Sequence, residues 1–367
     1  MGMRIMIAGG GTGGHIFPAI AIANALVKLQ EGTEILFVGA NGKMEMEKVP
    51  QAGYKIVGLD IAGFNRSSLI KNAGLPWKLL KSFVRIRNVI RKFKPDAVIG
   101  VGGYSSFPVL RMAQRMRIPT FIHESNSFGG RSNIMLGKRA TKIFTGTDGM
   151  EKFFPKEKIL VTGNPVRSAI VNAQITKEEG VQFFSLSKER KTVLIIGGSL
   201  GARSINETID KGLENLLDAG LQLIWQTGKP YVEKGKARAG NMEHVWVNDF
   251  ITEMQYAYAA ADIVVSRSGA MAVAELCVVK RPVLFVPYPF AAEDHQTVNA
   301  MQLVKKNAAL MVKDSEAASK LIFMTIELSK DEVKQEEMKE NIGKLAITNA
   351  DSVIANEILR AINKEKT

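Results

Sequence analysis

GGGTGGH, residues 9–15, is the stretch of sequence that decides the fold. It follows an apolar strand candidate at residues 4–8 (RIMIA) and leads into a helical stretch with Pro18 near its start. Five glycines around one threonine let backbone N–H groups approach a ligand closely, and the positive end of the helix favours an anion. The last residue, His15, can exchange a proton near neutral pH. The pattern predicts phosphate chemistry at a strand-to-helix turn.

The same stretch formally matches the dinucleotide fingerprint G-x-G-x-x-G through Gly9, Gly11 and Gly14. That fingerprint expects an acidic residue after the second strand, where it binds a ribose. Here the second strand candidate ends in GAN, with Asn41 at that place. The Walker pattern for ATP also fails, because no lysine follows the glycines. The turn therefore suits phosphate without being a standard nicotinamide or ATP site, and a purely structural turn is the alternative.

Short apolar runs alternate with helical stretches along the whole chain, in two series. Runs of this kind predict parallel strands covered on both faces, and two series predict two doubly wound α/β domains. The first series is 4–8, 34–39, 96–101, 119–123, 142–146 and 159–162, and the second is 192–198, 221–226, 244–247, 262–266, 282–287 and 308–312. Each series opens with a strand, a glycine-rich turn and a helix, the second turn being GGSLGA at 197–202.

The length of 367 residues also fits two domains of ordinary size. We place the boundary at TGNPVR, residues 162–167. This predicts an N-terminal domain over residues 1–165 and a C-terminal domain over residues 166–345. The remaining residues, 346–367, are expected to form a helix that can pack back on the N-terminal domain.

Composition restricts the class of protein. Apolar residues make up 46% and charged residues 23%, as in soluble globular proteins. No apolar run reaches the roughly 18 residues of a membrane span, and the first residues lead directly into a strand rather than a signal peptide. One cysteine, Cys277, excludes an internal disulfide and fits a reducing cytoplasm. Four histidines without ligand spacing predict no catalytic metal.

The net charge of +13 belongs to the first half of the chain. Residues 1–166 hold 24 Lys and Arg against 10 Asp and Glu, and residues 61–95 hold nine basic residues and no acidic one. Such a patch suits an anionic membrane surface or nucleic acid, and a solvated helix face is the alternative. In the amphipathic stretch 75–93, Trp77 and Leu80 lie off the core-facing stripe beside Lys78 and Lys81, which predicts shallow contact with a lipid interface.

Two further motifs of the first half lie at strand ends. GVGGYSSFP (100–108) is a second glycine-rich turn, and HESN (123–126) follows the next strand. Loops at the carboxyl ends of parallel strands line the ligand crevice. We therefore expect Gly102, Gly103, Glu124 and Asn126 to converge with the first turn.

The second half carries a corresponding set of motifs. GGSLGA offers Ser199 and backbone amides at a helix start, and SRSGAMAVAEL (266–276) places Glu275 on the next such helix. A carboxylate there can accept two hydrogen bonds from vicinal sugar hydroxyls. PYPFAAEDHQTVNA (287–300) is a proline-punctuated loop with Asp294, His295, Gln296 and Asn299. This polar cluster suits a sugar.

Together, GGGTGGHIFPAIAIANAL, GVGGYSSFP, HESN, TGNPVR, GGSLGA, SRSGAMAVAEL and PYPFAAEDHQTVNA resemble, in the same order, the MurG family of bacterial UDP-N-acetylglucosamine—N-acetylmuramyl-(pentapeptide) pyrophosphoryl-undecaprenol N-acetylglucosamine transferases. The resemblance spans residues 4 to about 300. It implies the GT-B glycosyltransferase fold, in which two Rossmann-like domains face across a cleft. It also implies an enzyme that completes lipid II in peptidoglycan biosynthesis, and so a role in cell-wall biogenesis, cell shape and cell division.

The implied reaction is an inverting transfer of N-acetylglucosamine from UDP-GlcNAc to the 4-hydroxyl of a MurNAc-pentapeptide on a polyprenyl diphosphate (lipid I), giving a β-1,4 link. The implied partners are these two substrates, anionic lipids of the cytoplasmic membrane face, where the protein is peripheral, and other cell-wall synthesis proteins. No cofactor, metal or nucleic acid is expected.

The resemblance also assigns residues. It implies donor contacts by Thr12, Gly13, Gly14, Asn126, Arg167, Ser199, Ile251 and Gln296, with Glu275 on the uridine ribose, and an acceptor loop of Gly102, Gly103 and Tyr104. The resemblance also implies that His15 and Glu124 lie near the reacting centre. We expect His15 to be the general base, with Glu124 as its competitor or orienting partner.

The chain departs from the family pattern at Ser125, where HEQN is usual, and at Leu200, where GGSQGA is frequent. Both replacements remove a polar amide, so specific contacts by these two side chains are in doubt. The alternatives are a UDP-sugar epimerase or glycolipid synthase of the same fold, and a basic nucleic-acid-binding protein, for which the basic patch lacks a recognisable module.

Overall fold

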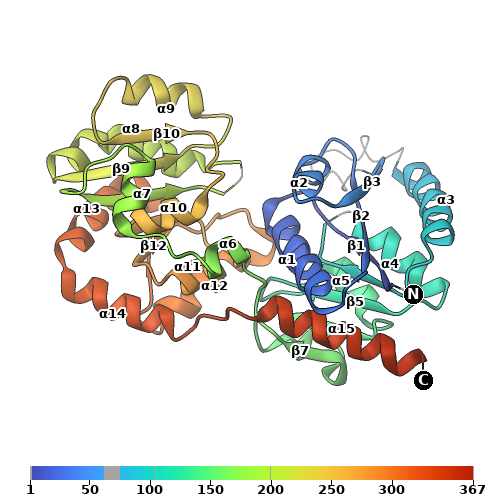
Figure 1. Ribbon diagram of the computed structural model, residues 1–367. Coiled ribbons are helices and arrows are strands. Elements are labelled where there is room, and N and C mark those ends of the chain that lie inside the picture. Colours follow the sequence, from blue (N-terminus) through green and yellow to red (C-terminus); the bar gives the residue numbers. More distant parts are fainter. Residues whose placement is uncertain (1, 62–74, 104, 199, 367) are drawn as a thin grey trace. The chain divides into compact units, whose positions relative to one another are not determined.

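The computed structural model describes residues 2–61, 75–103, 105–198 and 200–366, and for residues 75–80, 292, 365 and 366 it describes the backbone alone. The chain divides into two compact units (Figure 1). The first comprises Met1–Arg167 together with Asn349–Thr367, and the second comprises Ser168–Thr348.

The first unit is built on a seven-stranded parallel sheet with the order β3-β2-β1-β4-β5-β6-β7. Its strands are β1 (Arg4–Ala8), β2 (Glu34–Ala40), β3 (Lys55–Leu59), β4 (Ala97–Gly100), β5 (Thr120–Glu124), β6 (Lys142–Thr145) and β7 (Ile159–Val161). The strand order reverses direction between β1 and β4, which pair in register. In open sheets of this kind, ligands bind outside the carboxyl ends of the strands at that switch point.

Both faces of this sheet are covered by helices, which explains why successive residues of its central strands are buried on both sides. Along β1, Ile5 and Ile7 pack with α1 (Gly13–Leu29), α2 (Glu45–Gln51) and α15 (Ala350–Lys366). Met6 and Ala8 pack on the opposite side with α3 (Leu75–Phe93), α4 (Ser106–Arg115) and α5 (Arg131–Gly137).

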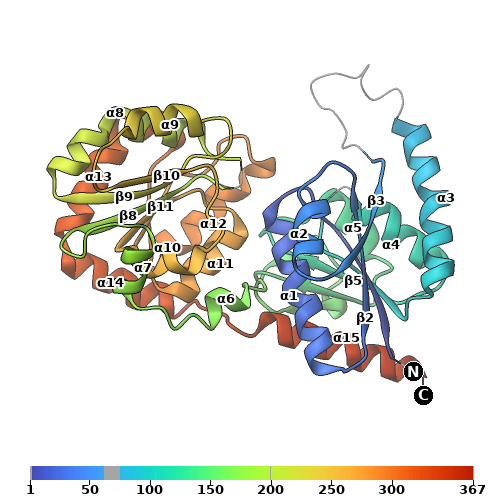
Figure 2. The ribbon, with the colours of Figure 1, turned by 45° about the horizontal axis from the view of Figure 1, so that its top comes forward.

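Helix α15 belongs to the first unit although it ends the chain. It packs against α1, and the two helices lie next to each other in both views (Figures 1 and 2). Ile354, Ile358 and Ile362 are buried in the core that α1 also covers. An ion pair between Lys142 and Glu357 ties the helix to β6. The last helix therefore completes one face of the first sheet.

The second unit repeats the plan with a six-stranded parallel sheet of order β10-β9-β8-β11-β12-β13. Its strands are β8 (Lys191–Ile196), β9 (Leu221–Gln226), β10 (Val245–Asn248), β11 (Ile263–Ser266), β12 (Val283–Phe285) and β13 (Leu310–Met311). Its helices are α6 (Ser168–Val171), α7 (Lys177–Phe183), α8 (Arg203–Asp218), α9 (Val232–Ala239), α10 (Met254–Ala260), α11 (Ala270–Val279), α12 (His295–Val304), α13 (Ala317–Lys330) and α14 (Glu332–Gly343). Its switch point lies between β8 and β11.

Each apolar run of the two series coincides with a strand, so the expected pair of doubly wound sheets is confirmed. Strand β3 was not predicted from the sequence, because its five residues (KIVGL) include a lysine and a glycine. Among the described residues, β3 pairs with β2 alone. The core-facing stripe expected in residues 75–93 includes Phe83, Ile86, Ile90 and Phe93 of α3, which pack against the core. No helix in the described ranges is both long enough and apolar enough to cross a membrane.

Candidate active site

Two glycine-rich turns meet at the switch point of the first sheet. The turn after β1 donates a hydrogen bond from the Gly10 N–H to the Gly102 carbonyl, which follows β4, at 3.3 Å. A β-carbon at Gly103 would lie 2.3 Å from the Gly10 carbonyl oxygen, and one at Gly9 would lie 2.2 Å from Val101 Cγ2. Glycine is therefore required at these positions because the two turns are in contact. The expected convergence of GGGTGG with GVGG is confirmed.

The Ser106 side chain, in the first turn of α4, connects the same two turns. Its buried hydroxyl lies 2.8 Å from the carbonyl oxygens of both Ala8, the last residue of β1, and Gly102. The first turn of α4 thus fixes the spacing between the ends of β1 and β4.

The side chain of Glu45, at the start of α2, is buried behind the first glycine turn. Its carboxylate accepts hydrogen bonds from the N–H groups of Gly11 at 2.8 Å and Ala40 at 2.9 Å. The N–H groups of Gly9, Gly10 and Gly11 all have acceptors within the protein. The N–H groups of Thr12, Gly13 and Gly14 precede the first intrahelical bonds of α1 and are the ones in this turn that can bind an anion.

The imidazole of His15 lies against the second turn. Its Nδ1 is 3.2 Å from the Gly10 carbonyl oxygen, and a β-carbon at Gly102 would lie 2.7 Å from both Cδ2 and Nε2. A carbonyl oxygen only accepts hydrogen bonds, so Nδ1 carries the proton in the neutral ring. Nε2 then presents a lone pair, which is the form that a general base needs.

The environment of His15 favours that neutral form. Burial lowers the pKa of His15 below its ordinary value of 6.5, while Glu124, the Gly10 carbonyl and Glu45 act in the opposite direction. The imidazole is thus unprotonated at neutral pH, and the carboxylates can stabilise the cation once a proton arrives.

A second histidine, His123, is fully buried at the end of β5. Burial lowers the pKa of His123 to about 4, and the neighbouring His15 acts in the same direction, while a hydrogen bond with the Gly163 backbone opposes them. His123 is therefore neutral at physiological pH. No role for His123 was predicted from the sequence, because the motif HESN alone does not indicate which of its side chains is buried.

Glu124 uses both of its carboxylate oxygens within the protein. Oε1 accepts from the backbone and side-chain nitrogens of Asn126 at 3.2 and 3.3 Å. Oε2 accepts from Gly130 N–H at 3.0 Å and from Asn133 Nδ2 at 2.8 Å, at the start of α5. This arrangement makes Glu124 an organiser of the loop that carries Asn126, and it leaves His15 as the stronger candidate for the base.

The TGNPVR loop reaches the same edge of the sheet. Asn164 donates from Nδ2 to the Ser125 carbonyl at 3.1 Å. The Arg167 guanidinium lies over the Phe17 ring, 4.6 Å from its centroid, and that ring lies against Gly13. A cation thus flanks the first turn of α1, where the free N–H groups lie.

In the second unit, the turn after β8 packs on the end of β9. A β-carbon at Gly201, whose φ is +75°, would lie 2.0 Å from the Thr227 carbonyl oxygen. Gln226 donates from Nε2 to the Gly198 carbonyl at 3.1 Å. Ser199 lies outside the described residues. Leu200, where this chain departs from the GGSQGA pattern, is 75% exposed.

The other predicted donor contacts lie at the same sheet edge. Glu275, on α11, is buried and accepts a hydrogen bond from the Tyr258 hydroxyl at 3.0 Å. Gln296, at the start of α12, accepts from the Tyr288 N–H at 3.0 Å, and its carbonyl accepts from Ser268. Ile251, after β10, is 2% exposed. The SRSGA turn and the loop before α12 are thus joined into one surface.

Arg267, which was not predicted from the sequence as a site residue, connects the segments that form this surface. Its buried guanidinium contacts the Asp314 carboxylate at 2.6 Å and the carbonyls of Val286 and Pro287 at 2.9 and 3.0 Å. It also donates to Ser204 on α8 at 3.0 Å. The sequence signal for Arg267 was weak, because an arginine between two serines looks like part of an ordinary polar turn.

Several predicted residues cannot be placed. Tyr104 and the side chains of Trp77, Lys78 and Leu80 lie outside the described residues, whereas Lys81 is exposed on α3. Within the described ranges, His, Cys, Asp and Glu side chains do not gather in threes that could hold a metal ion.

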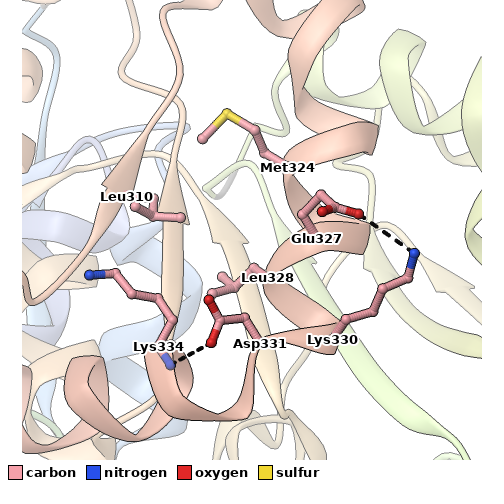
Figure 3. A pocket seen from close by; sticks show the side chains of 7 residues that line it. All are labelled: Leu310, Met324, Glu327, Leu328, Lys330, Asp331 and Lys334. Atoms are coloured by element: carbon pink, nitrogen blue, oxygen red, sulfur yellow. Dashed lines mark hydrogen bonds and ion pairs between the residues drawn. The ribbon is translucent and has the colours of Figure 1, made fainter.

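A cavity of about 520 Å³ lies away from these motifs, lined by residues of β13, α13 and α14 (Figure 3). Lys330 and Glu327 form an ion pair across its rim, and Asp331 accepts from the Lys334 N–H. The Lys334 ammonium forms an ion pair with Glu337 at 2.8 Å, and the cavity adjoins the carboxyl end of α13 rather than the switch point.

Comparison with known proteins decides the family. The model of the glycosyltransferase family 28 N-terminal domain matches residues 5–145, and that of the family 28 C-terminal domain matches residues 192–357. The chain belongs to glycosyltransferase family 28. The first matched region contains strands β1 to β6 and the second contains β8 to β13, so each includes the switch point of its sheet.

Curated relatives of this family 28 chain are similar over nearly their full length. Proteins of Phocaeicola vulgatus and Bacteroides fragilis are each 49% identical, over 99% and 98% of this chain and 97% and 95% of their own. Both are named UDP-N-acetylglucosamine—N-acetylmuramyl-(pentapeptide) pyrophosphoryl-undecaprenol N-acetylglucosamine transferase.

Among solved structures, MurG of Acinetobacter baumannii superposes with a TM-score of 0.75 at 27% identity, covering 98% of this chain and 99% of its own. A UDP-GlcNAc 2-epimerase of Neisseria meningitidis has a TM-score of 0.70 at 17% identity, covering 98% and 100%, which shows likeness of fold alone. The expected GT-B fold and the resemblance to MurG are confirmed.

We predict that His123 makes the protein less stable as the pH falls. Its pKa of about 4 in the folded state lies below the value of about 6.5 expected in the unfolded chain. Between these values the unfolded chain binds more protons, so stability rises with pH. The full shift corresponds to about 3 kcal/mol in the free energy of unfolding.

Urea unfolding between about pH 4 and pH 7.5 measures this dependence. His123→Asn should unfold with a shallower pH dependence than the wild type, because Asn does not titrate. Identical slopes for the two proteins would show that His123 is not held neutral by burial.

Proposed function

We propose that the protein transfers N-acetylglucosamine from UDP-GlcNAc to the 4-hydroxyl of a MurNAc-pentapeptide linked to a polyprenyl diphosphate. Two facts support this: the family 28 match with relatives named for this transfer, and the base-competent Nε2 of His15 at the switch point. The second fact supports the mechanism, because an unprotonated imidazole beside a turn suited to phosphate can accept the proton of the attacking hydroxyl.

The reaction requires one bond to form and one to break. The acceptor 4-oxygen attacks the anomeric carbon of the donor as the bond from that carbon to the UDP oxygen breaks. The electron pair leaves with UDP, the configuration inverts, and a β-1,4 link results. The hydroxyl proton passes to Nε2 of His15 as the sugar develops oxocarbenium character.

The departing diphosphate gains negative charge, which needs stabilisation. We assign this to the N–H groups of Thr12, Gly13 and Gly14 at the start of α1 and to Arg167 beside them. Asn126, held by Glu124, and Ser199, Ile251, Gln296 and the ribose-binding Glu275 complete the proposed donor contacts. No cofactor is needed, since UDP-GlcNAc brings its own leaving group. Gly102, Gly103 and Tyr104 are assigned to the acceptor.

The decisive assay uses radiolabelled UDP-GlcNAc and a lipid-linked muramyl-pentapeptide. We expect label in the lipid fraction, and a loss in kcat of about 10²–10⁴-fold in His15→Ala, the usual worth of a general base. Asn215→Ala, a change at an exposed residue of α8, is the control and should keep normal turnover. Epimerised or hydrolysed donor without transfer would contradict the proposal, and near-normal turnover of His15→Ala would remove it as the base.

We further propose that the basic outer face of α3 binds anionic lipids at the cytoplasmic side of the membrane. Lys81, Arg85, Arg87, Arg91 and Lys92 are exposed there, together with Val84, which is 58% exposed. Asp60 approaches Arg85 at 3.9 Å. Each basic residue near an anionic surface contributes about 1 kcal/mol of attraction. Peripheral binding at this face would bring the enzyme to its lipid-linked acceptor.

Sedimentation with vesicles of phosphatidylglycerol and phosphatidylcholine tests this surface. The triple variant Arg85→Glu, Arg87→Glu, Arg91→Glu should bind at least tenfold more weakly, and added salt should weaken the wild type. Lys188→Glu, Lys229→Glu, Lys236→Glu makes the same charge change on exposed residues of the second unit and should bind normally. Equal losses in the two variants would show that only net charge matters.

A further inference from the structure

The buried carboxylate of Glu45 has no part in the mechanism above, yet it lies within the glycine turn that carries His15. It is 1% exposed, and both of its oxygens accept backbone hydrogen bonds, from Gly11 and Ala40. A buried carboxylate is costly unless it is fully hydrogen-bonded. The presence of a carboxylate at this buried position, where an apolar side chain would cost less, therefore points to a role in the site.

The turn is shaped around this carboxylate. A β-carbon at Gly10, whose φ is +147°, would lie 2.2 Å from the Glu45 carboxyl carbon. One at Gly39, in β2, would lie 2.5 Å from Glu45 Cγ. Two glycines of neighbouring segments thus leave the room that the side chain occupies.

One peptide group connects Glu45 with His15. The Gly10 carbonyl accepts the hydrogen bond from His15 Nδ1 at 3.2 Å, and the Gly11 N–H donates to Glu45 Oε2 at 2.8 Å. These two groups belong to the same peptide bond, between Gly10 and Gly11. A carboxylate that accepts from the N–H of a peptide makes its carbonyl a stronger acceptor, because consecutive hydrogen bonds polarise one another.

We propose that Glu45 is a positioning residue for the transfer reaction: through the Gly10–Gly11 peptide it fixes the Nδ1–H tautomer of His15 and stabilises the imidazolium formed when Nε2 takes the acceptor proton. The arrangement parallels a carboxylate that orients a catalytic histidine, with a peptide group between the two. The catalytic part of this inference depends on the proposed function, whereas the hydrogen-bond relay does not.

The charged groups around His15 are consistent with this role. Glu45 on α2 and Glu124 on β5 each favour the protonated imidazole, and His123 on β5 is the neighbouring titratable ring. Glu124 already accepts four hydrogen bonds from Asn126, Gly130 and Asn133. Glu45 is therefore the carboxylate that has a bonded path to His15.

The first test is an NMR measurement on labelled full-length protein, which requires no turnover. In the wild type, the ring nitrogens of neutral His15 should report a proton on Nδ1, and a proton on Nε2 would overturn the relay. In Glu45→Gln, the midpoint of the His15 titration should fall by about half a pH unit or more, because a negative charge that favours the imidazolium is lost. Glu47→Gln, an exposed change on the same helix, is the matched control and should leave the midpoint unchanged. An unchanged midpoint in folded Glu45→Gln would overturn the relay.

The second test uses the transfer assay. Glu45→Gln should lower kcat about tenfold, in the range typical of partners that orient a reactive group, with little change in the KM for UDP-GlcNAc. The acid limb of kcat/KM should move to lower pH, and Glu45→Asp should restore part of the rate. In a His15→Ala background, Glu45→Gln should cost little more, because the two residues act as a unit.

The outcomes of the two tests separate the two ideas. A wild-type protein with the Nδ1–H tautomer and a shifted midpoint in Glu45→Gln, but without transfer, would support the relay and contradict the proposed function. If transfer occurs and Glu45→Gln slows it without moving the acid limb of kcat/KM, the relay is contradicted and the proposed function stands. The same conclusion follows if Glu45→Gln slows transfer by the same factor in the His15→Ala background as in the wild type.

Discussion

The contact between two glycine-rich turns is the constraint on which the first unit depends. The turn after β1 and the turn after β4 approach until the Gly10 N–H reaches the Gly102 carbonyl and the backbone of Gly103 lies on that of Gly10. Parallel neighbours β1 and β4 end at the same edge, and their helices leave toward opposite faces. The contact follows from that topology, and it places the His15 imidazole against Gly102.

Two histidines and two carboxylates gather around this contact, and their surroundings give them different tasks. His123 is fully buried and stays neutral, whereas His15 keeps one nitrogen bonded to the Gly10 carbonyl and the other available. Glu124 and Glu45 are both buried, but one organises the loop before α5 and the other supports the glycine turn. One available imidazole nitrogen, with two carboxylates that bind different segments, suits the proposed reaction, in which one proton must be removed.

Much of this could be predicted from local sequence. The apolar runs predicted both sheets, because a strand that is buried on two faces does not alternate between apolar and polar residues. The glycine turns and HESN marked the ends of the strands. Glu45 could not be found in this way. In the segment KMEMEK it resembles the solvent-exposed acid of any helix start, and it is buried only because β2 pairs with β1 and brings α2 behind the turn. The bonding of Glu124 and Arg267 likewise depends on segments far apart in the chain.

Placement of the proposed base, the His15 imidazole, by the close approach of the two turns is the point on which the proposed mechanism depends. It is tested most directly by the turnover of Gly103→Ala compared with Gly42→Ala. Both glycines have positive φ, +85° and +70°, but a β-carbon meets the Gly10 carbonyl at the first and open space at the second. We predict that folded Gly103→Ala loses about 100-fold or more in kcat, the cost of misplacing a reactive group by about 1 Å, while Gly42→Ala stays near the wild-type rate. Equal turnover in the two folded variants would contradict the account.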